Sequence, residues 1–363
     1  MITLTIPDVR EQDIGLAVDV LRSGQLVQGE YVCRLEEALA TYIGARHVVA
    51  VSSGTAALHL ALEALGIGAG DAVVVPAFSF VATANAVRLA GAEPVFADVS
   101  PTDYNLDVDL LERTIRGYGG AGRLKAIMPV HEFGCPADMT GISEIAKRYD
   151  LAVVEDAACG LGARHAGRHV GVFGACGCFS FHPRKSITTG EGGAIATEDG
   201  ALAERLRLLR SHGVVRDEEG RIDCVAVGYN YRMTDFQAAL FLHQLERFPG
   251  NLSARRVLVE AYYDGLAKHD RLGFPERTEG HAWQSLMLLR KEGDLPALIR
   301  AARESGIQLG QGAQCIPTTS AYGLAEGFPV ADRCEHQGFV VPLYAGLSPE
   351  DAKRVMAWLR EWL

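Results

Sequence analysis

The chain has 363 residues, of which 48% are hydrophobic and 22% charged, so it is globular and long enough for roughly two to three domain-sized units. Its net charge of −10 argues against a nucleic-acid partner, which requires a basic face. No apolar run approaches the roughly 20 residues that span a bilayer, and the N-terminus lacks the features of a signal peptide, so we expect no membrane partner.

The cysteines indicate a reducing environment. Eight are scattered along the chain, and the sequence CGC at residues 176–178 holds the one close pair. Because neighbours on one strand face do not bridge easily, we expect free thiols and a cytoplasmic protein. The chain has no CxxC pairs, so we predict no metal site.

Strands alternate with helices over most of the chain. Helices are predicted over residues 9–21, 30–42, 56–65, 79–89, 107–115, 139–149 and 199–210. Strands are predicted over residues 47–51, 72–76, 94–97, 124–130, 151–154, 178–182 and 194–197. This alternation indicates an α/β fold with a mostly parallel sheet, in which ligands gather at the carboxyl ends of the strands.

A proline-glycine pair is expected to divide the rest of the chain. Helices are predicted over residues 235–248 and 252–266, with a break at Pro249 and Gly250. We therefore predict a large α/β domain over residues 1–250 and a smaller α+β domain over residues 251–363. The smaller domain is expected to contain strands over residues 283–290 and 306–309 and helices over residues 294–304 and 348–362.

Lys185 is the first candidate site residue. It follows the strand over residues 178–182, which Pro183 ends, and precedes a glycine-rich turn. An amine near a buried strand end is a candidate Schiff-base residue, because desolvation or a neighbouring cation makes it nucleophilic. The alternative is an ordinary solvated lysine.

Two further features lie at strand ends. The sequence SSGT at residues 52–55 begins a helix, where free N–H groups favour an anion such as phosphate; the alternative is a simple capped helix. Asp156 ends an apolar strand and needs a donor or cationic partner, for example a protonated ring nitrogen; the alternative is a cap for the segment that follows. His131 also follows a strand and is a candidate to line a cleft.

Five motifs in order resemble the DegT/DnrJ/EryC1/StrS family of pyridoxal-phosphate-dependent sugar aminotransferases. They are SGTAAL at residues 53–58, VPAFSF at 75–80, EDAA at 155–158, SFHPRK with TGEGG at 180–193, and GYNYRM with QAA at 228–239. The resemblance covers nearly the whole chain. It implies the fold of the fold-type I pyridoxal-phosphate transferases, with a seven-stranded, mostly parallel sheet.

The resemblance also implies the roles of particular residues. Lys185 is similar to the catalytic Schiff-base lysine, and Asp156 to the aspartate that keeps the pyridine nitrogen protonated. Phe80 matches the aromatic residue that stacks on the ring, and Cys159 stands where many members have glutamine or histidine near the ring oxygen. The phosphate-binding positions are matched by Gly54, Thr55, Ala56, Ser180 and Asn230. Asn230 is expected to act from the neighbouring subunit of a homodimer with shared active sites.

The substrates implied are an amino donor, usually glutamate, and a nucleotide-linked keto sugar as acceptor. Members that dehydrate sugars carry histidine in place of the lysine, so Lys185 argues against that branch. Gln314 and Pro317 stand in a stretch where many members have a tyrosine and a histidine that helps to hold the nucleotide. A keto-cyclitol or another unlinked carbonyl compound is therefore the alternative acceptor, and a cofactor-binding regulator without turnover is a third hypothesis.

Overall fold

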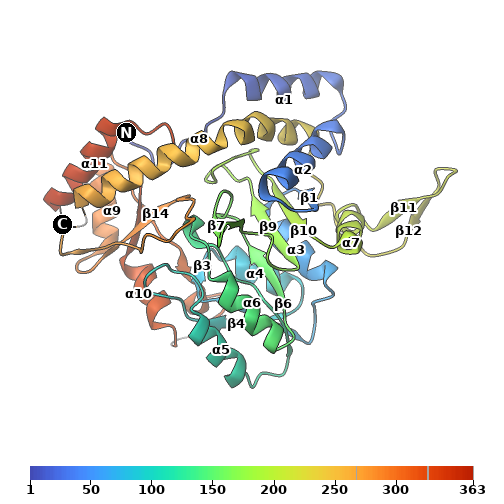
Figure 1. The fold of residues 1–363 in the computed structure, drawn as a ribbon, viewed down its shortest axis with the longest axis horizontal. Helices are drawn as coiled ribbons and strands as arrows, with labels where there is room; N and C mark the ends of the chain where they lie inside the picture. Colours follow the sequence, from blue (N-terminus) through green and yellow to red (C-terminus); the bar gives the residue numbers. More distant parts are fainter. Residues whose placement is uncertain (267, 325–326, 363) are drawn as a thin grey trace.

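The computed structural model describes residues 1–266, 268–324 and 327–362 (Figure 1). Its centre is a seven-stranded sheet, as the resemblance implies. The strands in sheet order are β1 (His47–Val51), β10 (Gly193–Thr197), β9 (Cys176–Ser180), β6 (Ala152–Asp156), β5 (Arg123–Ile127), β2 (Asp71–Pro76) and β4 (Glu93–Ala97). Strand β10 runs antiparallel to both of its neighbours, and the remaining pairs in the sheet are parallel.

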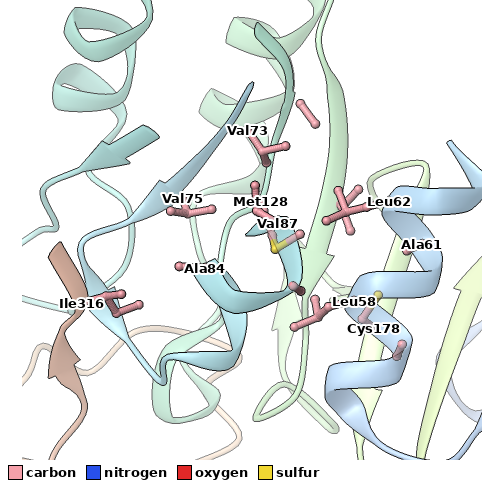
Figure 2. Close-up of a cluster of buried hydrophobic side chains, with 14 of the residues drawn as sticks. Leu58, Ala61, Leu62, Val73, Val75, Ala84, Val87, Met128, Cys178 and Ile316 are labelled. Atoms are coloured by element: carbon pink, nitrogen blue, oxygen red, sulfur yellow. The ribbon is translucent and has the colours of Figure 1, made fainter. Parts of the chain in front are cut away.

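Helices pack on both faces of this sheet. They are α2 (Glu30–Ile43), α3 (Gly54–Ala64), α4 (Ala82–Leu89), α5 (Val108–Gly117), α6 (Met139–Arg148) and α7 (Gly200–Arg210). Helix α1 (Glu11–Ser23) packs instead on α8 (Asp235–Leu266). Helix α3 is buried on nearly every side because it lies between the sheet and two other helices, which its alanine- and leucine-rich sequence permits. In Figure 2, Leu58 and Leu62 of α3 point toward Met128, just past β5.

The helix α8 differs from the prediction. It runs without interruption over Asp235–Leu266 and includes Pro249, so the predicted break at Pro249 and Gly250 is wrong. Phe248 and Leu252 are buried on either side of the proline, and α1 lies along the first half of α8. This tertiary packing outweighs the local cost of a proline in a helix interior.

The C-terminal part contains a second, antiparallel sheet. Its strands in order are β13 (Leu272–Gly273), β14 (Leu286–Arg290), β17 (Gly338–Val341) and β15 (Gly310–Gln311). The same part of the chain contains the helices α9 (Leu295–Glu304), α10 (Pro329–Gln337) and α11 (Pro349–Trp362). The strand predicted over residues 306–309 therefore lies slightly later in the chain, and α10 and β17 have no counterpart in the prediction. Ile2 packs into the core of this part, which explains why both chain ends lie there in Figure 1.

Short elements complete the fold. The paired strands are β3 (Phe78–Ser79) with β16 (Gln314–Cys315), β7 (Arg164–His165) with β8 (Arg168–His169), and β11 (Val214–Arg216) with β12 (Ile222–Cys224), and the 3₁₀ turns are η1 (Glu132–Gly134) and η2 (Ile316–Thr318). The β11–β12 hairpin extends away from the body of the molecule (Figure 1). Among the described residues, no helix combines the length and apolar character that crossing a bilayer requires.

Candidate active site

The predicted site residues lie at one edge of the central sheet, where parallel strands end. Asp156 is the last residue of β6, and Lys185 lies in the turn after β9. Cys159 lies in the turn after β6, and its thiol is 3.0 Å from Nζ of Lys185. The lysine is partly buried, so its amine meets a protein group and does not extend freely into solvent.

Asp156 is buried and hydrogen bonded on both oxygens. The hydroxyl of Thr83 donates to Oδ2 at 2.8 Å, and the backbone N–H of Ala158 donates to Oδ1 at 3.1 Å. Burial raises the pKa of Asp156, although the Thr83 and Ala158 hydrogen bonds and the charge of Lys185 oppose the shift. The hydrogen bond from Ala158 shows that Asp156 does cap the segment that follows it, which is the alternative to a binding role. This bond does not prevent the carboxylate from also interacting with a cationic partner.

The charges around Lys185 favour its protonated form. Burial lowers the pKa of Lys185, but the contact with Cys159 and the charges of Asp156 and Glu132 outweigh this effect, and the pKa is raised. Burial raises the pKa of the Cys159 thiol. The amine therefore lies against the Cys159 thiol and close to two buried carboxyl groups, Asp156 and Glu132, all of which favour its protonated form.

The start of α3 provides the features of an anion site. Ser53 caps the helix by accepting from the N–H of Ala56 at 3.1 Å, so the predicted cap is present. A Cβ atom on Gly54 would lie 2.8 Å from Cβ of Ser180, so a residue with a side chain would push the two segments apart. The helix start and the Ser180 hydroxyl therefore form a cradle lined by Gly54, Thr55, Ala56 and Ser180, whose chemistry fits a phosphate group.

The remaining predicted residues are exposed or lie beside an exposed residue. Phe80 follows β3, and its residue surface is 63% exposed, so an apolar ring is open to a ligand. Asn230 is exposed and makes no side-chain hydrogen bond within the part of the chain that the structure describes. Gln314 pairs with Ser79 in the β3–β16 ladder, which brings the divergent stretch beside Phe80.

His131 does not line the cleft, so that expectation is wrong. Its Nε2 lies 3.0 Å from Oε2 of Glu155, and neither side chain is exposed to solvent. Glu155 also accepts from the backbone N–H groups of Gly171, Phe173 and Gly174. Burial raises the pKa of Glu155, but these hydrogen bonds and the interaction with His131 outweigh it and lower the pKa. The contact between His131 and Glu155 therefore holds the C-terminal end of β6, where Asp156 lies.

Two residues near the site were not predicted. Thr83 lies in α4, and its hydroxyl reaches Asp156 because that helix packs beside the end of β6. Glu132 is buried in η1, after β5, and interacts electrostatically with Lys185 and Asp156. A charged residue just past an apolar strand is the signal that would have pointed to Glu132.

The comparisons with known proteins identify the class of this enzyme, which is an aminotransferase. The model of the DegT/DnrJ/EryC1/StrS aminotransferase family matches residues 7–360, and the chain belongs to this family. The resemblance and the fold class inferred from the sequence are thereby confirmed.

Individual relatives cover almost the whole chain. GDP-perosamine synthase of Caulobacter vibrioides is 40% identical over 92% of this chain and 91% of the relative. UDP-4-amino-4-deoxy-L-arabinose–oxoglutarate aminotransferase of Shewanella sediminis is 34% identical over 98% of this chain and 96% of the relative. The PMP-form structure of Spr1654, a putative sugar aminotransferase from Streptococcus pneumoniae, superimposes with a TM-score of 0.91 at 27% identity, covering 98% of both chains.

Proposed function

We propose that this aminotransferase transfers an amino group from glutamate to a keto sugar that is linked to a nucleotide, with pyridoxal 5′-phosphate as cofactor. The observation that carries the proposal is that Lys185, in the turn after β9, contacts Cys159, in the turn after the adjacent parallel strand β6, which ends at Asp156. The start of α3 lies against Ser180 at the same edge of the sheet and offers an anion site. A reactive amine, a buried carboxylate and a phosphate site are the three environments that this cofactor needs.

We assign the protein's own groups the following roles. Lys185 would bind the cofactor's aldehyde and afterwards hold and release a proton at Nζ, while Asp156, oriented by Thr83, would keep the ring nitrogen protonated. Phe80 would cover one face of the ring, and Cys159 would lie near the ring oxygen. When bound, the cofactor supplies an aldehyde for amines and a ring that withdraws electrons. The phosphate would be held by Gly54, Thr55, Ala56 and Ser180, with Asn230 of a second subunit completing a shared site.

The names of the relatives support the substrate class. Both named curated relatives carry a nucleoside diphosphate and an amino sugar in their names, and one also names oxoglutarate, whose amino counterpart is glutamate. The alternative acceptor is a keto-cyclitol or another unlinked carbonyl compound. It is favoured by Gln314 and Pro317, which stand in a stretch where many members have a tyrosine and a histidine that helps to hold the nucleotide.

The test begins with the purified protein and pyridoxal phosphate. We expect visible absorbance from the lysine-bound cofactor, which is lost when glutamate is added and returns when a nucleotide-linked keto sugar follows. The Lys185→Ala variant should remain folded and show none of these changes. Absence of any response to amino donors would contradict the proposal and favour the regulator, whereas equal rates with keto sugars that lack the nucleotide would favour the alternative acceptor.

A further inference from the structure

Glu132 is a buried carboxyl group with an unpaired oxygen. The residue is 5% exposed, and its Oε2 has no hydrogen-bond partner within the described residues. Leaving such a group unpaired costs free energy, so natural proteins keep few of them and each calls for an explanation.

The backbone holds this side chain in place with an unusual turn. Phe133, which follows Glu132, has a φ of 53°, in the left-handed region that few residues other than glycine adopt. Gly134 has a φ of 87°, and a Cβ atom there would lie 3.1 Å from the carbonyl oxygen of Cys159 and 2.9 Å from the backbone nitrogen of Gln284. The N–H of Glu132 donates to Oδ1 of Asn105 at 2.9 Å. The turn is thus packed directly against the Cys159 turn, whose thiol contacts Lys185.

The ionisable groups that face Glu132 come from several elements. On the side of the active site they are Lys185, Asp156 and Cys159. On the other side a small cavity is lined by Glu132 together with Asp103, Tyr104, Cys135 and His281. The hydroxyl of Tyr104 is also without a partner among the described side chains.

Most of these neighbours are neutral near pH 7. Burial raises the pKa of Cys135 to about 12 and also raises the pKa of Tyr104, so neither carries a negative charge. Burial lowers the pKa of His281 to about 3, so it carries no positive charge. Among the described groups that face Glu132, Lys185 is therefore the one that can be a cation.

We propose that Glu132 is a positioning residue of the aminotransferase site, whose carboxylate stabilises the ammonium form of Lys185 and thereby sets the pH at which this amine becomes nucleophilic. Burial raises the pKa of Glu132 itself to about 7, while Lys185 lowers it and Asp156 raises it, so the carboxylate forms near neutral pH. Lys185 in turn has its pKa raised by the negative charge of Glu132, in addition to the contact with Cys159 and the charge of Asp156.

This inference rests on the proposed function in one respect, which is the attachment of Lys185 to the cofactor's aldehyde. In that step the neutral amine adds to the aldehyde carbon, a C=N bond forms, and one water leaves. Because the ammonium form cannot react, the attachment rate follows the fraction of neutral Lys185. Removing the negative charge at residue 132 should let the ammonium lose its proton at a lower pH.

The experiment measures the attachment of pyridoxal phosphate to the cofactor-free protein between about pH 8 and about pH 12 by stopped-flow absorbance, because the raised pKa of Lys185 places the wild-type midpoint above its ordinary value. We expect Glu132→Gln to move the midpoint of the rate profile about one pH unit lower. Glu132→Asp keeps the charge and should stay within about 0.3 pH unit of the wild type. Glu198→Gln removes an exposed carboxylate that pairs with Arg46, at 3.4 Å, and should leave the midpoint unchanged.

The outcomes separate the two proposals. An unchanged midpoint in a folded Glu132→Gln protein overturns this inference while leaving the proposed function intact. If that variant does not fold, Glu132→Leu replaces it, because leucine fills the volume without a buried polar group, and its midpoint is judged by the same criterion. A wild-type protein that does not attach the cofactor overturns the proposed function and this inference together.

Discussion

Thr83 controls the orientation of the carboxylate at the centre of the site. Its hydroxyl donates to Asp156 at 2.8 Å and lies 3.2 Å from the hydroxyl of Ser79, and all three side chains are buried. Buried hydrogen bonds to charged groups contribute about 1.5–3 kcal/mol each. The Thr83 hydrogen bond also opposes the effect of burial on the pKa of Asp156.

We expect Thr83→Val to reduce turnover by about 10- to 100-fold. Valine has nearly the same shape but no hydroxyl, so the pKa of Asp156 rises further and the carboxylate loses its orientation. Steady-state rates with glutamate as donor would show the effect. Thr83→Ser keeps the hydroxyl and should stay within about threefold of the wild type. Equal rates for the valine and serine variants would show that the hydrogen bond is not needed.

Site residues differ in how far the sequence reveals them. Lys185, Asp156 and Gly54 stand out because each lies next to a recognisable strand or helix end. Thr83 does not, because its importance comes from the contact of α4 with the end of β6, two segments that are distant in the chain. A pattern of local spacing holds no information about such contacts until the order of strands is known.

At the scale of elements, the sheet and its helices could largely be predicted from periodicity, but α8 could not. A proline followed by glycine is a strong local signal for a break. The signal fails here because Arg247 binds Asp8 and Asp13, while Phe248 and Leu252 are buried, so the helix is held from both sides of the proline. Packing decides the structure where the local preference is worth only a few kcal/mol.

Pro249 should therefore be replaceable with a gain in stability. Its side chain is exposed, and proline cannot donate the hydrogen bond that the helix interior normally contains. We expect Pro249→Ala to raise the free energy of unfolding by about 1–3 kcal/mol, measured by urea denaturation.

Gly250→Ala serves as a matched control in the same turn, because a Cβ atom there meets nothing within 4 Å. It should add about 0.5–1 kcal/mol. A loss of stability in Pro249→Ala alone would mean that the bend imposed by the proline is required for packing.

At the scale of the whole molecule, the β11–β12 hairpin and the segment after it suit an interface. Val215 and Ile222 in the hairpin and Val225 and Val227 beyond it are 42–88% exposed, and Asn230 follows them directly. Exposed apolar clusters of this kind mark contact surfaces. They support the proposed homodimer, in which each subunit contributes Asn230 to the site of the other.

Mixed dimers test this arrangement. Lys185→Ala and Asn230→Ala proteins should each be nearly inactive when cofactor is limiting. After unfolding and refolding together, half of the dimers combine both variants, and one of their two sites is intact, so about one quarter of wild-type activity should return. No recovery, with mixed dimers demonstrated by differential tagging, would place Asn230 in its own subunit's site.

The antiparallel strand β10 limits where insertions and deletions can be tolerated in this enzyme. It follows β9 through residues 181–192, without a crossover helix, and this connection carries Lys185. Both ends of the connection are fixed by adjacent strands that pair from Ser180 with Gly193 onward. An inserted residue there would change the reach of the lysine, whereas an insertion at the tip of the β11–β12 hairpin would leave it untouched. Natural length differences and engineered insertions should therefore accumulate in that hairpin and avoid the lysine loop.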